Sequence, residues 1–275
     1  MGIRITTLSE NTADIGLIGE WGLSILIEAD GLRILFDTGQ SFSVTHNARA
    51  LKVDLSKIDK VVLSHGHFDH TGGLREVLGQ TEGMDIIAHP DALNPKFAVR
   101  EDTEMSIGIP FDRKELEDMG ARFNLTKEPV WITENIVTTG EIPMITDYEQ
   151  VDPGMFIKDK GSLQPDPLID DLAMAIRTEF GLTIILGCAH RGMINIIQRL
   201  QEITGEERVY CVVGGTHLLR ATEERLTKTV ADLRKTGIQR LGVSHCTGFD
   251  ASCRLAKEFP DIFFLNNAGV MITLS

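Results

Sequence analysis

The chain of 275 residues carries 27 lysines and arginines against 40 aspartates and glutamates, which gives a formal net charge of −13. Lysines and arginines are adjacent in the sequence only as pairs such as Arg113-Lys114. Nucleic acids and anionic membrane surfaces are therefore disfavoured as partners, because binding them needs clustered cations. A hydrophobic fraction of 42% with 24% charged residues excludes intrinsic disorder.

Neither the first residues nor the cysteines indicate export. Residues 1–17 lack the apolar stretch of a signal peptide. No segment reaches the ~20 apolar residues that a membrane-spanning helix needs. The cysteines form no CxxC pair; they are Cys188, Cys211, Cys246 and Cys253. We therefore expect a cytoplasmic protein with reduced thiols.

The first half of the chain predicts short strands joined by tight turns. Asp30-Gly31 lies between two aliphatic runs and favours a two-residue hairpin. Apolar residues at helical spacing predict a helix over residues 71–78. Strands are expected at 24–29, 33–36, 60–63 and 85–88.

The second half predicts alternating strands and helices. Residues from about 90 to 167 are less regular and hold most of the nine prolines, so we expect a cap or insertion on a single domain of residues 1–275. The later alternation indicates β/α layering. Strands are expected at 173–177, 183–186, 209–213, 240–243, 262–265 and 270–273, and helices at 194–203, 223–235 and 251–258.

The most informative stretch is a His-x-His-x-Asp-His run that directly follows a predicted strand. His65 and His67 project to one side of the loop, whereas Asp69 and His70 face a second point nearby. Imidazole and carboxylate are ligands of zinc and comparable ions, so the run predicts two metal positions that can share a water. Surface histidines satisfied by water are the weaker alternative, because crowded imidazoles beside a carboxylate have little physical reason to gather without a cation.

Three further histidines lie just past predicted strands. His190 follows Gly187-Cys188-Ala189, and His217 and His245 come after the next two strands. Strand ends along one edge of a sheet converge on a common site. These histidines are therefore expected near the metal loop.

Together these features resemble the metallo-β-lactamase superfamily. The His-x-His-x-Asp-His run is preceded by Phe36-Asp37-Thr38-Gly39 and followed by the strand-end histidines. Segments 187–190, 214–218 and 244–248 further resemble a branch whose members are labelled as relatives of the synthase of dihydropterin-methyl-ribofuranosylaminobenzene phosphate. The resemblance covers essentially the whole chain and implies an α/β fold, a four-layer αβ/βα sandwich.

The resemblance also implies a ligand set. It assigns His65, His67 and a later strand-end histidine to a first metal, and Asp69, His70 and His245 to a second. We choose His190 over His217 as that later histidine. Asp69 is in addition the expected catalytic residue, nearest the attacking water. The expected cofactors are two divalent ions, Zn²⁺ first, with Mn²⁺ or Fe²⁺ as alternatives. A structural histidine that caps a glycine-rich turn is the alternative for His190.

One departure concerns the group that bridges the metals. The superfamily usually supplies an aspartate after a strand that ends in Gly-Asp, whereas the comparable strand here ends in Gly187-Cys188. Cys188 is either a thiolate ligand or a small buried hydrophobic residue. Asp37 is expected to orient a ligand imidazole or to form a turn. Further candidates for ligation or substrate contact are His217, Asp170, Asp171 and His89.

The functional expectation is a metal-dependent hydrolase acting on a small, phosphorylated or ester-like substrate, in which the metals generate hydroxide from a bound water. The alternatives are a metal-assisted phosphoribosyl-type transferase or synthase of pterin cofactor biosynthesis, and a non-catalytic metal-binding protein. A di-iron reductase is disfavoured because such relatives carry glutamate where His67 stands. A nuclease is disfavoured by the charge of −13.

Overall fold

The computed structural model describes residues 2–101, 103–159 and 161–274. The chain forms two compact units. Unit 1 comprises Met1–Lys127, Asp152–Asp170 and Asn267–Ser275, and unit 2 comprises Glu128–Val151 and Asp171–Asn266. Each unit is built on a mixed β-sheet with helices, so the α/β class expected from the sequence is confirmed.

The main sheet of unit 1, called here the N-terminal sheet, is antiparallel from β17 to β3 and parallel from β3 to β8. Asp30 and Gly31, with φ of 52° and 77°, form the predicted hairpin turn between β2 and β3. Strands β1 and β8 were not predicted. The strand order is β17 (Met271–Leu274), β1 (Ile3–Ser9), β2 (Ser24–Ala29), β3 (Leu32–Phe36), β4 (Lys60–Val62), β5 (Met84–Ala88) and β8 (Ala121–Leu125).

The prediction of one continuous helix over residues 71–78 is wrong. Two short helices, α2 (Phe68–Thr71) and α3 (Leu74–Leu78), are separated by Gly72-Gly73. A Cβ would lie 2.0 Å from the Gln40 carbonyl oxygen at Gly72 and 2.1 Å from the Thr38 carbonyl oxygen at Gly73. The two glycines therefore let the chain pass close to a neighbouring backbone. Unit 1 also contains α1 (Ser43–Ala50), α4 (Arg113–Asp118) and the 3₁₀ turns η1 (Leu55–Lys57) and η2 (Pro90–Leu93).

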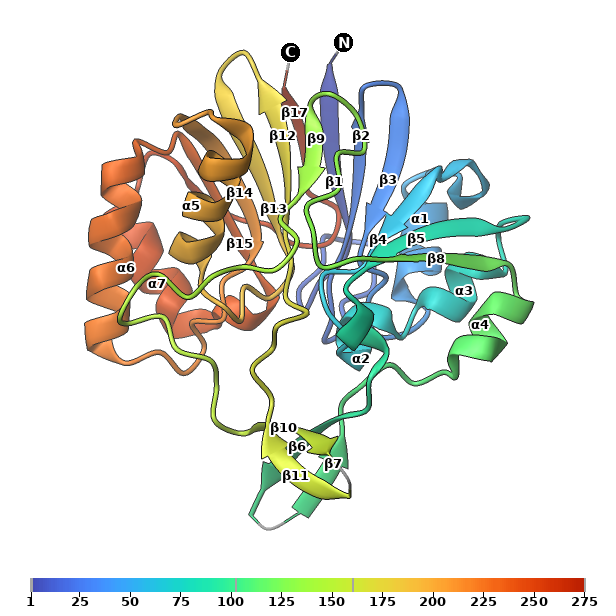
Figure 1. Cartoon of the computed structure of the whole chain (residues 1–275). Helices are drawn as coiled ribbons and strands as arrows, with labels where there is room; N and C mark the ends of the chain where they lie inside the picture. The colour runs from blue at the N-terminus through green and yellow to red at the C-terminus, as the bar shows by residue number, and fades with distance from the viewer. Residues whose placement is uncertain (1, 102, 160, 275) are drawn as a thin grey trace. The chain divides into compact units, whose positions relative to one another are not determined.

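A small antiparallel sheet also belongs to unit 1 and stands apart from the N-terminal sheet (Figure 1). Its strand order is β11 (Ser162–Pro165), β10 (Met155–Asp159), β6 (Lys96–Arg100) and β7 (Thr103–Ser106). The segment from 90 to 167 thus supplies this small sheet, strand β8 of the N-terminal sheet and strand β9 of unit 2.

Unit 2 follows the predicted alternation of strands and helices. Its main sheet, called here the C-terminal sheet, is parallel from β13 to β16 and antiparallel from β13 to β9. The strand order is β16 (Phe263–Leu265), β15 (Arg240–Ser244), β14 (Val209–Gly215), β13 (Gly181–Leu186), β12 (Met174–Thr178) and β9 (Ile136–Thr138). The helices are α5 (Met193–Thr204), α6 (Glu223–Thr236) and α7 (Phe249–Glu258), with the 3₁₀ turn η3 (His245–Thr247).

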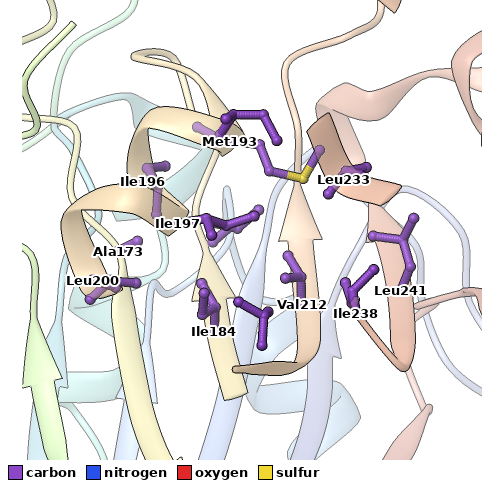
Figure 2. Close-up of a cluster of buried hydrophobic side chains, with 14 of the residues drawn as sticks. Ala173, Ile184, Met193, Ile196, Ile197, Leu200, Val212, Leu233, Ile238 and Leu241 are labelled. Atoms are coloured by element: carbon purple, nitrogen blue, oxygen red, sulfur yellow. The ribbon is translucent and has the colours of Figure 1, made fainter. Parts of the chain in front are cut away.

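The core of unit 2 lies between these helices and the sheet. Figure 2 shows Ile196, Ile197 and Leu200 of α5 against Ile184 and Val212 of the strands. The spacing of the three helix residues places them on one face, as the sequence pattern predicts. This packing fixes the ends of β13, β14 and β15 at one edge of the sheet. Among the residues that the structure describes, none of the helices is both long and apolar enough to cross a membrane.

The glycine break between α2 and α3 gives a stability prediction. Gly73→Ala is expected to lower the free energy of unfolding by about 1–3 kcal/mol, because the added methyl group overpacks a buried backbone contact. Gly79→Ala is the matched control, since Gly79 is exposed and a Cβ on it would lie 3.4 Å from its nearest neighbour. Equal denaturant midpoints for the two variants would contradict the steric explanation.

Candidate metal centre

The predicted metal loop follows β4 and leads into α2. His67 precedes the helix with extended backbone angles, and Asp69 and His70 lie in its single turn. His65 Nε2 lies 2.9 Å from His67 Nδ1, and the His65 and His70 rings are 4.3 Å apart between centroids. The structure therefore gathers in unit 1 the three imidazoles that the sequence placed together.

The buried carboxylate of Asp37 holds this loop from the end of β3. It accepts the Ser64 backbone N–H and the Ser64 hydroxyl, each at 2.7 Å, and His70 Nδ1 lies 2.6 Å away. When Nδ1 donates to Asp37, Nε2 of His70 is left as the metal-binding nitrogen. Asp37 therefore contacts the His70 imidazole, the kind of contact that the expected orienting role requires.

Asp37 achieves these contacts in a strained backbone conformation. Its φ is 59°, a left-handed value that costs a non-glycine residue of order 1–3 kcal/mol. Such strain persists only where the surroundings fix it, and here three hydrogen bonds of one carboxylate do so.

Trp21 is a site residue that the sequence analysis missed. Its indole Nε1–H donates to Asp69 Oδ2 at 3.0 Å. The backbone after it also contacts this residue, since Leu23 N–H donates to the Asp69 carbonyl at 3.2 Å. Trp21 therefore fixes the orientation of the Asp69 carboxylate. Trp21 belongs to no sequence motif. The rarity of tryptophan in the chain is the only feature of the sequence that could have drawn attention to it.

The protonation state of His67 suits metal binding. Burial lowers the pKa of this imidazole to about 4, although the charge of Asp69 opposes the shift. At neutral pH the ring is uncharged, and a neutral imidazole is the form that ligates a metal.

A buried ion pair supports the loop at Gly66, between the two histidines. Asp170 Oδ2 accepts the Gly66 N–H at 2.9 Å, and its Oδ1 lies 2.8 Å from Lys96 Nζ. Lys96 also pairs with Asp166 at 2.7 Å. Asp170 was predicted as a candidate ligand, and these contacts occupy both of its oxygens. Lys96 was not predicted, because a lone lysine in an irregular segment carries no sequence signal.

The charges in this ion pair are strongly coupled. Burial alone would raise the pKa of Asp170, but the Lys96 ammonium and the Gly66 N–H hold it below its usual range. Burial would likewise lower the pKa of Lys96, and the two carboxylates raise it instead. Both groups are therefore ionised, and removing one would leave the other as a buried unpaired charge.

The remaining candidates lie at strand ends in unit 2. Ligand atoms of Cys188, His190 and His217 lie within 4.8 Å of one another. The same holds for Cys188, His245 and Cys246. Cys188 and His190 follow β13, His217 follows β14, and the other two lie in η3 after β15. Parallel neighbouring strands thus bring together, in one unit, five side chains of types that can bind a metal.

Two other predicted residues have local structural contacts. Asp171 Oδ2 accepts the Arg191 N–H at 2.9 Å, at the turn after β13. His89 Nδ1 accepts the Asp91 N–H at 3.0 Å and so caps η2. His89 therefore has a structural role at this turn.

Comparison with known proteins identifies the family. Residues 22–190 match the sequence pattern of the metallo-beta-lactamase superfamily. The chain belongs to this superfamily. It is 34% identical, over 98% of its length and 96% of the relative's, to 7,8-dihydropterin-6-methyl-4-(beta-D-ribofuranosyl)-aminobenzene-5'-phosphate synthase of Methanocaldococcus jannaschii. A second, uncharacterized protein of that organism is also 34% identical, over 92% of the chain and 94% of the relative.

Solved structures agree with this assignment. The structure of Tm1679, described as a metal-dependent hydrolase of the beta-lactamase superfamily, is 30% identical with a TM-score of 0.86 and covers 99% of each chain. YhfI from Bacillus subtilis, at 11% identity and a TM-score of 0.60 over the full length of both chains, shares the fold. The α/β metallo-β-lactamase fold expected from the sequence is thereby confirmed. The imidazole, carboxylate and thiol donors fit a divalent transition metal.

The Asp37 contacts predict the effect of removing this carboxylate. Asp37→Ala is expected to weaken Zn²⁺ binding about 10–100-fold, because His70 and the Ser64 backbone lose their orienting partner. Competition with a chromogenic chelator measures the affinity. Asp59→Ala is the control, since Asp59 is an exposed carboxylate of unit 1 that bonds the Arg33 N–H. A folded Asp37→Ala protein with unchanged affinity would refute the orienting role.

The ion pair at Gly66 gives a second prediction. Asp170→Asn and Asp166→Asn each neutralise one of the two carboxylates paired with Lys96. Of the two aspartates, Asp170 is the one that contacts the metal loop, through the Gly66 N–H. Both variants are expected to lose stability, whereas only Asp170→Asn is expected to weaken Zn²⁺ binding, by about 10-fold. Equal metal affinities at matched stability would show that Asp170 has no role in positioning the loop.

Proposed function

We propose that the protein is a metal-dependent hydrolase that acts on a small phosphorylated or ester-like substrate, with a cytoplasmic location. The observation that carries the proposal is the oriented metal loop of unit 1, in which Asp37 fixes His70 and Asp170 fixes Gly66. The proposed ligands are His65, His67 and His190 for one ion, and Asp69, His70 and His245 for the other. Hydrolysis is favoured by the 30% identity to Tm1679.

Each residue of the loop has a chemical role in this proposal. Divalent ions bound here would polarise a carbonyl or phosphoryl oxygen and lower the pKa of water. Asp69 contributes a ligand and accepts a proton from the attacking water, while Trp21 keeps its carboxylate in place. Asp37 retains the tautomer of His70 that leaves Nε2 for the metal.

Substrate choice is assigned to the small sheet. Its first strand begins at Lys96, whose ion pair reaches the metal loop through Asp170. The chain beside it also contacts the loop, since the Phe68 N–H donates to the Ile107 carbonyl at 3.0 Å. We propose that the small sheet acts as a cap, because a long irregular segment tied to a site usually serves function.

A second candidate is the synthase reaction of the relative. The 34% identity over nearly the full length of both proteins favours it. Both candidates need the same metal loop, and they differ in whether water is a reactant. Incorporation of ¹⁸O from labelled water into the product therefore separates them. Phosphodiester, lactone, thioester and phosphoribosyl compounds are the substrates to screen.

Removal of Asp69 tests the catalytic assignment. Asp69→Ala is expected to bind one ion instead of two and to lose turnover by about 10²–10⁴-fold, because a ligand and a proton acceptor disappear together. Elemental analysis of protein purified without chelator gives the metal count. His46→Asn is the control, since His46 is an exposed histidine of α1. An Asp69→Ala protein with two ions and full activity would refute the proposal.

A further inference from the structure

Trp21 combines a fixed edge with an exposed surface beside the proposed catalytic residue. Its indole Nε1–H donates to Asp69 Oδ2 at 3.0 Å, and 46% of the residue is nevertheless exposed. The indole has a single polar atom, and this hydrogen bond engages it. Most of the surface that Trp21 presents to solvent is therefore apolar, and it lies on a ring whose edge contacts Asp69.

The backbone on both sides of Trp21 is attached to neighbouring loops of unit 1. The Glu20 carboxylate accepts the Gln40 N–H at 3.0 Å. A Cβ on Gly22 would lie 2.7 Å from the Asp69 carbonyl oxygen and 2.8 Å from the Gln40 nitrogen, so the glycine allows close packing there. Trp21 thus lies between two fixed points of the chain. A ring held in this way loses little conformational entropy when a ligand contacts it.

A hydrogen-bond donor for Asp69 does not have to be an indole. An asparagine or glutamine side chain also supplies an N–H, and it leaves far less apolar surface in water. The hydrogen bond alone therefore does not explain the large exposed ring at this position.

The second tryptophan of the chain provides an internal comparison. Trp131 of unit 2 is 43% exposed, close to the value for Trp21. The Arg177 guanidinium lies over its ring, 5.6 Å from the centroid, so a cation already contacts that aromatic face. Trp21 differs from Trp131 in its neighbour, which is a carboxylate of the metal run instead of a guanidinium.

We propose that Trp21 determines substrate specificity by stacking its ring against a planar, unsaturated ring of the substrate, next to the phosphoryl or ester group that reacts. The inference rests on the proposed function, because Asp69 marks the place of the reacting group. Two aromatic rings in an offset stack attract each other beyond the effect of the area they bury. A saturated ring of the same size lacks this attraction. The substrate class is thereby narrowed to aryl or heteroaryl phosphates and esters.

A pair of matched ligands tests this assignment without an activity measurement. 1-Naphthyl phosphate and decahydronaphthyl phosphate have the same carbon skeleton and the same charge, but the first has a planar aromatic ring system and the second a saturated one. The full chain loaded with Zn²⁺ is expected to bind the aromatic ligand about 5–50-fold more tightly in calorimetric titrations, because stacking adds to the burial of the ring.

Three variants separate the ring of Trp21 from its N–H group. Trp21→Leu removes both and is expected to abolish the preference for the aromatic ligand. Trp21→Phe keeps a ring and is expected to retain the preference at saturating Zn²⁺, although Asp69 loses its donor. Trp131→Phe is the matched control, expected to bind both ligands as the wild type does. It also leaves Trp21 as the one tryptophan of the chain, so quenching of its fluorescence by 1-naphthyl phosphate reports the stacking directly.

Each result decides the inference. A Zn²⁺-loaded wild-type protein that binds neither ligand, or both equally, would overturn the stacking role and leave the metal-dependent function intact. A preference that survives in Trp21→Leu would also overturn it. Failure of the wild-type protein to bind Zn²⁺ would reject the proposed function together with this inference. If Trp21→Leu fails to fold, the fluorescence of Trp131→Phe decides, since tight binding of 1-naphthyl phosphate without quenching would show that the ligand does not contact Trp21.

Discussion

The buried carboxylate of Asp37 is the contact on which the metal loop depends. It joins three pieces of backbone, since Asp37 ends β3, Ser64 follows β4 and His70 lies in α2. Each hydrogen bond to this anion occurs away from water, where an unpaired carboxylate would be costly. The same contacts that satisfy the charge therefore also fix the imidazole, so stability and function are coupled at one residue.

The opposite side of the loop is held by a second anion, Asp170, through the Gly66 N–H. Its partner Lys96 begins the small sheet, so the position of that sheet and the shape of the loop depend on one another. Gly66 makes this possible, because a Cβ there would lie 2.1 Å from the Ala92 carbonyl oxygen. The spacer glycine of the metal run is thus a steric requirement of unit 1 and not only a flexible link.

The sequence predicted the parts of the structure that depend on interactions between residues close together in the chain. The Asp30-Gly31 hairpin and the β/α alternation of unit 2 follow from turn geometry and periodicity, and the metal run is dense enough to indicate its own chemistry. The break at Gly72-Gly73 and the role of Trp21 depend on segments far away in sequence. Lys96 gave no signal for the same reason, since its carboxylate partners lie some 70 positions downstream.

The buried group of Lys96, Asp166 and Asp170 also shows why charged residues can occupy a position that apolar residues could fill. Replacing a buried ion pair with well-packed hydrophobic residues often leaves a protein equally stable, because the cost of removing the two charges from water offsets most of their attraction. An apolar side chain at position 170 could not accept the Gly66 N–H, however, and would leave that donor unsatisfied between His65 and His67, the proposed ligands. The ion pair therefore serves the orientation of the loop: Lys96 keeps Asp170 ionised, and the ionised Asp170 holds the backbone between His65 and His67.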